Sequence, residues 1–375
     1  MIYLQELRNS KEQVEFIGSS EHRESREQMR NMRFYDYYLW WIKTYKANRI
    51  SKVTLRKYYG EAKHLWKLVP DMRLKDYERS RESIQDLLDM FGKAHRHLTC
   101  LEFKNHVLAA LRMAVEDDFI DKIADSQLVV TSMEDNWSIE KRNKVLNKPK
   151  TMTASEFRLF KTRIEIDLTD ILSKPAIRHR SPKEAFSKNP EAKPVSEQTK
   201  LMVLNILFHT GCRFAEALGL TFGDIDFENR SIKIDKTWDY KSGTGFVPTK
   251  NKSSNRVVAV DDSLLDLIKK YKEWKHEQFG DVDLPMTIEP DTNTYNDTYN
   301  NFFRRYEKRY GIKEDLSIHK IRHSYISFLL SEGIAPETIA PQVGHSDTTM
   351  ITQVYGHLLK EQRDIDNLRI ASLMR

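Results

Sequence analysis

Apolar residues recur every three or four positions through most of this 375-residue chain, and this period predicts a mainly α-helical fold. The series begins with aromatic residues: Phe34, Tyr37, Tyr38, Trp41 and Tyr45. The same period then continues through three further apolar sets: Leu55, Tyr58, Tyr59, Ala62, Leu65 and Leu68; Ile84, Leu87, Leu88 and Phe91; Phe103, Val107, Leu108, Leu111 and Ala114. Ser51 and Thr54 are expected to cap the second of these helices, and Ser80 the third. Residues 33–125 are therefore predicted to form a compact helical domain, with the aromatic stripe in its core.

Only two short stretches of the second half alternate as strands do, Arg230–Ile234 and Arg256–Val260. They predict a small antiparallel β-ribbon among helices expected over 198–210, 263–279, 294–309 and 319–332. The expected fold class is mainly α with a small antiparallel β-ribbon or sheet, that is, α+β.

Shifts of composition suggest the boundaries between domains. Residues 1–32 are polar and form an N-terminal arm of unknown role, and 126–150 lose periodicity as an interdomain linker would. Residues 151–375 form the second domain, with an inserted proline-containing loop at 173–196 and an apolar tail after Tyr355.

Composition excludes some classes of protein. No apolar stretch approaches the roughly 18 residues that would span a bilayer, and no secretory signal opens the chain. Two cysteines, Cys100 and Cys212, are too few for a disulfide framework, so we expect a reducing, cytoplasmic location and no membrane partner.

The charge balance is weakly basic, with 61 lysine and arginine residues against 55 acidic ones. This total does not separate proteins that bind polyanions from those that do not, so the distribution of charge matters more. One basic cluster lies in the expected linker: Lys141, Arg142, Lys144, Lys148 and Lys150. It is either a solvated surface or a set of contacts to phosphates.

Four local motifs carry reactive side chains, and each alone has an ordinary structural interpretation. Arg213 and Glu216 are three residues apart on one expected helix and share a face, as a surface ion pair would. His319 and Arg322 have the same spacing. The other two motifs place Lys250 and Lys252 in a basic turn, and His345 ten residues before Tyr355: PTKNKSSNRVV and QVGHSDTTMITQVYGH.

Taken together and in this order, the motifs resemble the tyrosine recombinase (phage integrase) family, in particular integrases of phages and of integrative and conjugative elements. The matching residues are Arg213, Glu216, Lys250, His319-Lys320-Ile321-Arg322-His323, Gly344-His345 and Tyr355-Gly356-His357. Val343 and Ser324 depart from the commoner leucine and threonine, and neither is a reactive group. The segment between Asp235 and Lys250 is longer than in minimal members, so Lys252 is the alternative to Lys250.

The resemblance implies a helical core-site DNA-binding domain, a catalytic domain, and strand cleavage through a 3′-phosphotyrosyl intermediate at Tyr355. Guanidinium groups suit the charge that develops on the attacked phosphate, so Arg213 and Arg322 are the expected clamp and Glu216 supports Arg213. Tyrosine is a poor nucleophile while protonated, so His319 is the candidate base. Lys250 would protonate the leaving 5′ oxygen, and His345 would donate to the phosphate.

No cofactor is expected, because the phosphotyrosyl link conserves the bond energy for religation. The sequence also lacks a nucleotide-binding GxxxxGK[ST] loop. A metal site at His319 and His323 is disfavoured, because Arg322 on the same helix would repel a cation.

The expected partners are double-stranded DNA attachment sites, a homo-tetramer on paired sites, and accessory DNA-bending or excision factors. The apolar tail docks either on its own protomer or on a neighbouring one. Two alternative functions are compatible with the sequence: a type IB topoisomerase-like nicking and closing enzyme, and a non-catalytic DNA-binding regulator with the same fold.

Overall fold

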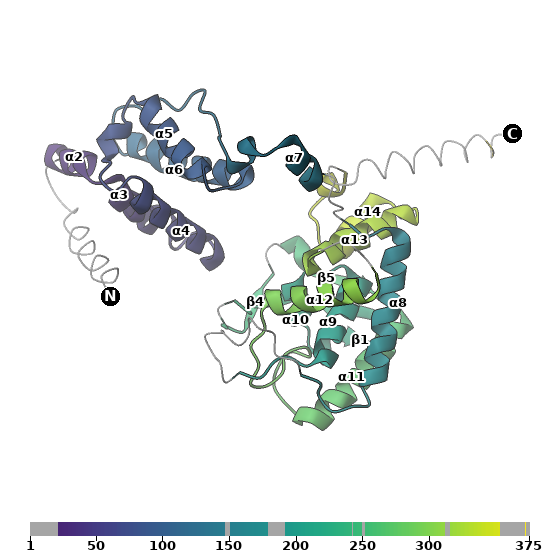
Figure 1. Ribbon diagram of the computed structural model, residues 1–375. Coiled ribbons are helices and arrows are strands. Elements are labelled where there is room, and N and C mark those ends of the chain that lie inside the picture. Colours follow the sequence, from purple (N-terminus) through teal and green to yellow (C-terminus); the bar gives the residue numbers. More distant parts are fainter. Residues whose placement is uncertain are drawn as a thin grey trace. The chain divides into compact units, whose positions relative to one another are not determined.

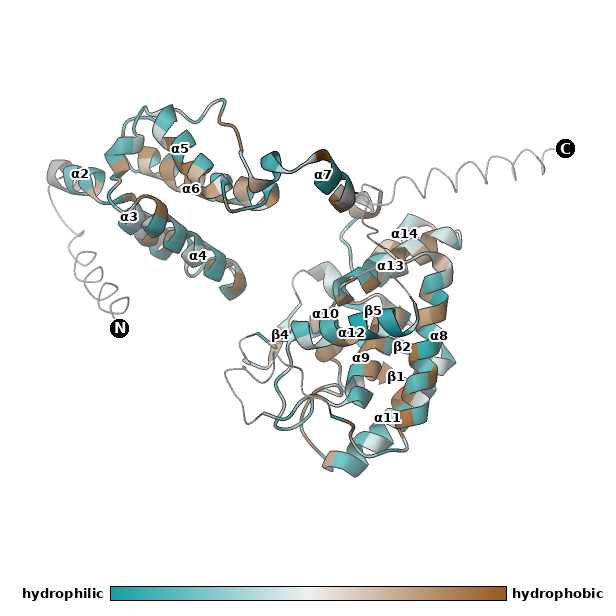
Figure 2. Ribbon diagram, in the orientation of Figure 1, coloured by the Kyte–Doolittle hydropathy of each residue, from teal (hydrophilic) through white to brown (hydrophobic). Residues whose placement is uncertain are grey.

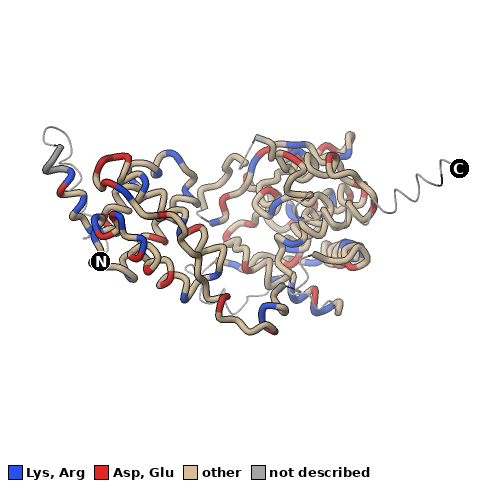
Figure 3. Tube along the Cα trace, turned by 90° about the horizontal axis from the view of Figure 1, so that it is seen from above, with Lys and Arg blue, Asp and Glu red and all other residues tan. Residues whose placement is uncertain are grey.

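The computed structural model describes residues 22–146, 151–178, 192–241, 243–249, 252–311, 316–352 and 372. The chain divides into two compact units, Met1–Asn147 and Lys148–Arg375 (Figure 1). Basic and acidic residues are interspersed along the traces of both units (Figure 3). The weak net charge is therefore not the property of one end of the chain.

The first unit is helical. Its helices are α2 (His22–Asn31), α3 (Phe34–Trp41), the π-helical turn η1 (Ile42–Lys46), α4 (Lys52–Leu68), the 3₁₀ turn η2 (Leu74–Tyr77), α5 (Arg81–Gly92) and α6 (His97–Glu116). Ser51 and Ser80 accept hydrogen bonds from the backbone N–H groups of Thr54 and Ser83, so both are confirmed as the N-caps of α4 and α5. Thr54 lies inside α4 and is not a cap, because its N–H is the donor to Ser51.

The aromatic stripe lies in the core of this unit, as predicted. Phe34, Tyr37, Tyr38 and Trp41 are fully buried, and Phe34 packs on Tyr77 with ring centroids 4.6 Å apart. Burial of such large side chains contributes roughly 1.5–3 kcal/mol each, which is enough to fix the packing of short helices.

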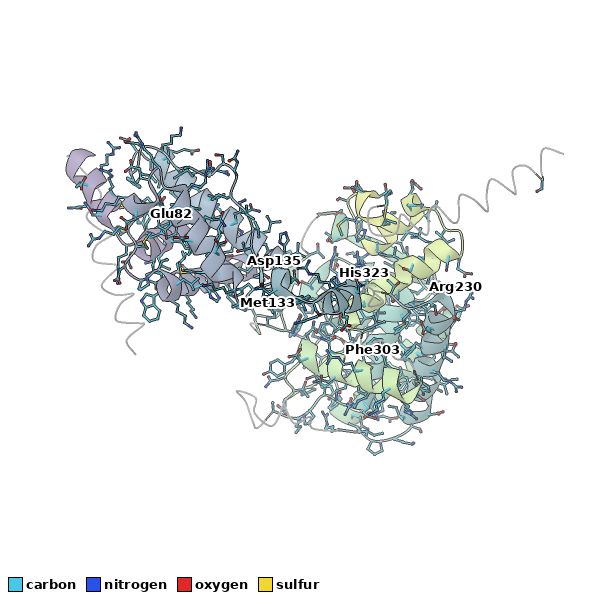
Figure 4. All side chains as sticks on the ribbon, turned by 45° about the horizontal axis from the view of Figure 1, so that its top comes forward. Glu82, Met133, Asp135, Arg230, Phe303 and His323 are labelled. Carbon is cyan, nitrogen blue, oxygen red and sulfur yellow. The ribbon has the colours of Figure 1, made fainter. Side chains whose placement is uncertain are left out.

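Residues on either side of the expected helical domain also pack onto this unit. Met29 of α2 is 1% exposed and belongs to its core, although it lies within the expected arm. Within the expected linker, Leu128 is buried in the same core, and the backbone of Thr131 lies against Gly92. The 3₁₀ turn η3 (Met133–Asn136) and α7 (Ile139–Leu146) follow. Figure 4 labels Met133 and Asp135 in this turn. The domain boundaries at residues 32, 125 and 150 stay predictions.

The second unit is built around α9 (Glu197–Thr210), every residue of which from Gln198 onward is buried. It packs against α8 (Ala154–Ile171), α10 (Phe214–Leu218), α11 (Asp262–Phe279) and α13 (Ile318–Ser331). The remaining helices are α12 (Asn296–Arg309) and α14 (Pro336–Val343). An outer helix such as α8 alternates between hydrophilic and hydrophobic residues, as an amphipathic helix must (Figure 2).

The two predicted strands are confirmed as β2 and β5, and with β1, which was not predicted, they form a three-stranded antiparallel sheet in the order β1-β2-β5. The strands are β1 (Ile225–Asp226), β2 (Ser231–Ile234) and β5 (Arg256–Ala259), and Ile232 lies opposite Val258. The mainly helical class with a small antiparallel sheet is therefore confirmed.

The structure also contains a two-stranded sheet that the sequence analysis did not predict. It joins β3 (Lys236–Trp238) to β4 (Phe246–Pro248), with Thr237 opposite Val247. These strands bury no face completely, so they lack the alternation of apolar residues on which strand prediction depends. The 3₁₀ turns η5 (Phe222–Asp224) and η6 (Lys252–Ser254) flank the two sheets. Across the described ranges, no helix is long and apolar enough to cross a membrane.

Candidate functional site

Arg213 is held by a turn between two helices. Gly211 ends α9 in the left-handed conformation, with φ of 58°, and Arg213 is the N-cap residue of α10. A side chain at Gly211 would collide with the ring of Tyr325, and the positive φ itself favours glycine. The turn thus places Arg213 at the start of a buried helix, with its side chain still 32% exposed.

Arg322 reaches the same turn from α13. Its Nη1 donates to the carbonyl oxygen of Gly211 at 2.9 Å, and the residue is only 5% exposed. Its Nη2 is buried and has no hydrogen-bond partner among the described residues. Burial, followed by the charge of Arg213, lowers the pKa of Arg322 to about 10. The fold therefore holds two cations near each other and leaves one strong donor unsatisfied.

Glu216 compensates part of this charge. It is 1% exposed, and its Oε1 accepts from Nη1 of Arg213 at 2.7 Å, while its Oε2 accepts the backbone N–H of Arg213 at 2.9 Å. The predicted pairing of these two residues is confirmed. Sequence reasoning missed the second cation on this carboxylate, since Oε2 also accepts from Nη2 of Arg256 at 2.9 Å.

The side chain of Arg256 contacts three segments of the chain, at Glu216, Ser254 and Gln342. Its side chain is 5% exposed and donates to the backbone oxygens of Ser254 and Gln342, both at 2.9 Å. A Cβ built on Gly344 would lie 2.9 Å from its Nη1, so the backbone before His345 runs close over this guanidinium. One feature of the sequence pointed to Arg256: it is a charged residue at the first position of a predicted strand, and that strand contacts the core. That signal did not reveal the partners.

His345 follows the C-cap of α14. Gly344 ends the helix with φ of 71°, and the backbone N–H of His345 donates to the oxygen of Ala340. Nδ1 of His345 is buried without a partner among the described residues. Burial, and then the charges of Arg322 and Arg213, lowers the pKa of His345 to about 4, so the ring is neutral at pH 7.

His319 and His323 stand on adjacent turns of α13, with ring centroids 5.3 Å apart; Figure 4 labels His323. Burial, and then Arg322, lowers the pKa of His319, although much of the residue is exposed. Burial, and then Lys320, lowers the pKa of His323 to about 4. Both pKa shifts favour the neutral form of the ring. Among the described residues, no group of three His, Cys, Asp or Glu side chains is arranged to hold a metal ion.

Several predicted site residues lie outside the described residues. They are Tyr355, Lys250, Lys148 and Lys150, together with the side chains of Lys144 and Lys252. Lys141 and Arg142 are exposed on α7: Nζ of Lys141 lies 4.4 Å from the ring centre of Trp137, and Arg142 donates to the backbone oxygen of Asp135.

The described part of the site therefore unites residues from four elements around one positive centre. Besides burial, the charge of Arg213 lowers the pKa of Arg322, and the charges of Arg322 and Arg213 lower the pKa of His345, as expected for neighbouring cationic groups in a poorly solvated place. Two buried nitrogen atoms there, Nη2 of Arg322 and Nδ1 of His345, have no hydrogen-bond partner among the described residues. Such a set of atoms suits an oxyanion that carries more than one acceptor oxygen.

Comparison with solved structures gives the class of this fold: it is that of the tyrosine recombinase integrases. The integrase of the Tn1549 transposon, in complex with transposon right end DNA, superposes with a TM-score of 0.64 at 18% identity, over 91% of this chain and 100% of that one. A lambda integrase dimer bound to a COC′ core site gives 0.56 at 15% identity, over 94% and 85%.

Residues 182–362 match the model of the phage integrase family. The ICEBs1 integrase of Bacillus subtilis (strain 168) is 29% identical over 181 residues, which are 47% of this chain and 49% of the relative. The integrase of Staphylococcus phage L54a is 26% identical, over 40% and 46%. The chain spans about half the length of the curated relatives that it matches.

Proposed function

We propose that this protein is a site-specific DNA recombinase that integrates or excises a mobile element through a 3′-phosphotyrosyl intermediate. One observation carries the proposal: the unsatisfied, buried Nη2 of Arg322 lies at a centre that Arg213 and His345 share. A buried cation with an N–H group that makes no hydrogen bond destabilises the fold, unless a ligand supplies the acceptor. The scissile phosphate of DNA supplies both the negative charge and the oxygen.

The roles of the residues follow from their chemistry. Arg213 and Arg322 bind the non-bridging oxygens and stabilise the charge that grows in the transition state. Glu216 and Arg256 hold Arg213 in place and do not react. His345 is neutral and donates a hydrogen bond to the phosphate. Tyr355 attacks the phosphorus, and neutral His319 takes its proton.

The relatives support a DNA substrate. The Tn1549 integrase was solved with transposon right end DNA and with circular intermediate DNA, and the lambda integrase as a tetramer on a Holliday junction. By analogy we propose that this chain acts on double-stranded attachment sites as a homo-tetramer, assisted by accessory DNA-bending or excision factors. Lys141, Arg142, Lys144, Lys148 and Lys150 would bind phosphates of the DNA backbone, and the affinity for DNA would fall with salt.

A suicide substrate tests the proposed function. Duplex DNA nicked beside the exchange point loses a short fragment after cleavage, so the enzyme stays covalently attached. The wild-type protein should accumulate an adduct that survives denaturing gel electrophoresis, with the nucleotide linked to Tyr355 in peptide mass spectra. Tyr355→Phe should form none, because only the phenolic oxygen can make the bond.

An adduct with Tyr355→Phe would show that another residue is the nucleophile. Absence of any adduct with the wild type, on DNA that it binds, would instead favour a non-catalytic DNA-binding regulator. Relaxation of supercoiled DNA by the monomer, without paired sites, would favour the topoisomerase-like activity.

The general acid can be assigned with a modified leaving group. Lys250→Ala and Lys252→Ala are compared on DNA with an ordinary 5′ oxygen and with a 5′-bridging sulfur, which leaves without a proton. We expect Lys250→Ala to lose about a hundredfold in cleavage rate on ordinary DNA and to recover on the sulfur substrate. Lys252→Ala should be slowed less and should gain nothing from the sulfur. Rescue of Lys252→Ala alone would transfer the role to Lys252.

A further inference from the structure

His209 lies in the last turn of α9, where its ring is enclosed between two carboxylates. The side chain is only 2% exposed, and its Nε2 lies 2.8 Å from Oε1 of Glu165 on α8. Its Nδ1 lies 2.9 Å from Oδ1 of Asp261, the N-cap residue of α11. The helices α8, α9 and α11 pack on one another in the second unit (Figure 1). One imidazole ring therefore joins all three helices.

The positions of the two carboxylates indicate a protonated ring. An ionised carboxylate only accepts hydrogen bonds, so a ring nitrogen without a proton would repel the oxygen that faces it. A neutral imidazole has one N–H and could satisfy Glu165 or Asp261, but not both. Because a carboxylate oxygen lies within 3 Å of each ring nitrogen, both nitrogens of His209 carry a proton. The ring is a buried cation.

Both carboxylates are ionised in this arrangement. The ring of His209 is the main cause that lowers the pKa of Asp261 below its ordinary value. Burial opposes the ionisation of Glu165, but His209 and then Lys161 outweigh it and hold its pKa below the ordinary value. Nζ of Lys161 lies 2.7 Å from Glu165 and 3.2 Å from Asp261. Two cations and two anions thus form one balanced network.

The other helices that pack on α9 bring no substitute for the charge of His209. On α13, burial raises the pKa of Tyr325 and the charge of Asp261 adds to this shift, so the phenol stays neutral. On α10, Glu216 is paired with Arg213 and Arg256. Burying charged groups costs desolvation, and apolar residues often stabilise a fold as much. The geometry that the network fixes is therefore the better explanation of its presence.

That geometry is the end of α9, which carries the catalytic turn. Gly211 follows His209 by two residues, and its N–H donates to the oxygen of Leu207 at 3.0 Å. Its own carbonyl oxygen accepts from Nη1 of Arg322 at 2.9 Å, and Arg213 follows two residues later. A cation in the last turn also interacts favourably with the partial negative charge at the end of a helix. Fraying of this turn would move both guanidinium groups.

We infer that the imidazolium of His209 is a positioning group for Arg213 and Arg322. Held between Glu165 and Asp261, it keeps the end of α9 in the conformation that places both guanidinium groups on the phosphate. The inference rests on the proposed function and adds to it a residue that touches neither the DNA nor the reacting atoms.

A comparison of cleavage with DNA binding tests the inference. His209→Gln removes the charge and keeps a donor for one carboxylate. We expect the single-turnover rate of adduct formation, at saturating suicide substrate, to fall by about tenfold or more, because a displacement of about 1 Å can cost a hundredfold in rate. The Kd for the duplex should change by less than about threefold, because many phosphate contacts contribute to affinity.

Asn205→Ala is the matched control. Asn205 lies one turn earlier on the same face of α9, is fully buried, and donates to the backbone oxygen of Leu201 at 3.1 Å. Its removal should lower resistance to urea. Under conditions in which both variants are folded, Asn205→Ala should still cleave at close to the wild-type rate. Equal slowing of the two variants, or a wild-type rate for His209→Gln, would overturn the inference.

Asp261→Asn gives a second measurement, which decides the question if His209→Gln does not fold. Asparagine caps helices as well as aspartate does, so α11 keeps its N-cap while the network loses one charge. The rate of adduct formation should fall, by less than in His209→Gln. The double variant should be no slower than His209→Gln alone, because both changes act through one contact. A wild-type rate for Asp261→Asn, or losses that multiply in the double variant, would contradict the role of His209.

Inorganic phosphate separates this inference from the proposed function. The anion should raise the melting temperature of the wild type and of Asn205→Ala, and raise that of His209→Gln less, because the arginine pair is displaced. This response does not require Tyr355. A wild-type protein that forms no adduct, while His209→Gln still weakens the response to phosphate, would refute only the recombinase. Adduct formation at equal rates by wild type and His209→Gln would refute only the role of His209.

Discussion

Arg322→Met should slow covalent cleavage by about a hundredfold or more, because removing one preformed oxyanion donor typically costs about 3 kcal/mol of transition-state stabilisation. The side chain is buried, and its Nη2 has no partner among the described residues, so we expect the substrate phosphate to be its acceptor. Methionine fills a similar volume without a charge. The single-turnover rate of adduct formation on the suicide substrate measures the effect.

The same change should cost little stability. Burial and Arg213 lower the pKa of Arg322 to about 10, which means that the fold disfavours its charge when no anion is bound. Losing the charge relieves this repulsion and offsets the lost hydrogen bond to Gly211, so the free energy of unfolding should stay within about 1 kcal/mol of the wild type.

Two controls sharpen this prediction. Inorganic phosphate should raise the melting temperature of the wild-type protein and not that of Arg322→Met, because the anion binds only the folded wild-type site. Arg322→Lys keeps a charge but loses the planar fork, so it should recover binding of phosphate better than cleavage. A variant that cleaves at the wild-type rate, or one that unfolds, would contradict the role given to Arg322.

Glu216→Gln should destabilise the protein by about 3 kcal/mol or more, since it leaves two guanidinium groups without their counter-charge in a buried place. Glu216 is 1% exposed and contacts both Arg213 and Arg256 within 3 Å. Glutamine keeps the size of the side chain but accepts at one oxygen only. Urea denaturation at neutral pH measures the loss.

The effect should depend on pH with a definite sign. Burial opposes the ionisation of Glu216, but Arg256 and then Arg213 outweigh it and hold its pKa below the ordinary value. A carboxylate with a depressed pKa contributes stability above its unfolded pKa, about 4.3, and loses it as the pH falls through the folded value. The difference between wild type and Glu216→Gln should therefore be full at neutral pH and shrink in acid.

Glu332→Gln is the matched control. Its carboxylate also pairs with an arginine, Arg158, but the two side chains are 40% and 57% exposed. Solvent screens such a pair, so its removal should change the free energy of unfolding by less than about 1 kcal/mol. Equal losses of unfolding free energy in the two variants would mean that Glu216 stabilises the protein no more than an exposed ion pair does.

Periodicity predicted the parts of the fold that depend on local sequence. The helices around Tyr58, Leu87 and Val107 and the strands near Ile232 and Val258 were read from spacing, because burial of one face imposes a period of 3.6 or 2 residues. The β3–β4 hairpin was not predicted, because neither strand buries a complete face and so neither shows an alternation of apolar residues. The order of the reactive residues along the chain likewise indicates a resemblance to the phage integrase family, without any knowledge of their geometry.

The tertiary structure alone decided how those residues meet. Arg322 and Gly211 are 111 positions apart, and Arg256 and Gln342 are 86 apart, so no local spacing could reveal their contacts. The left-handed turn at Gly211 lies against Tyr325 and the turn at Gly344 lies against Arg256, so both depend on packing between segments that are distant in the sequence. The sequence by itself determined which side chains are present and in what order. The fold decided which charges are buried together, because burial and charge proximity are properties of long-range contacts.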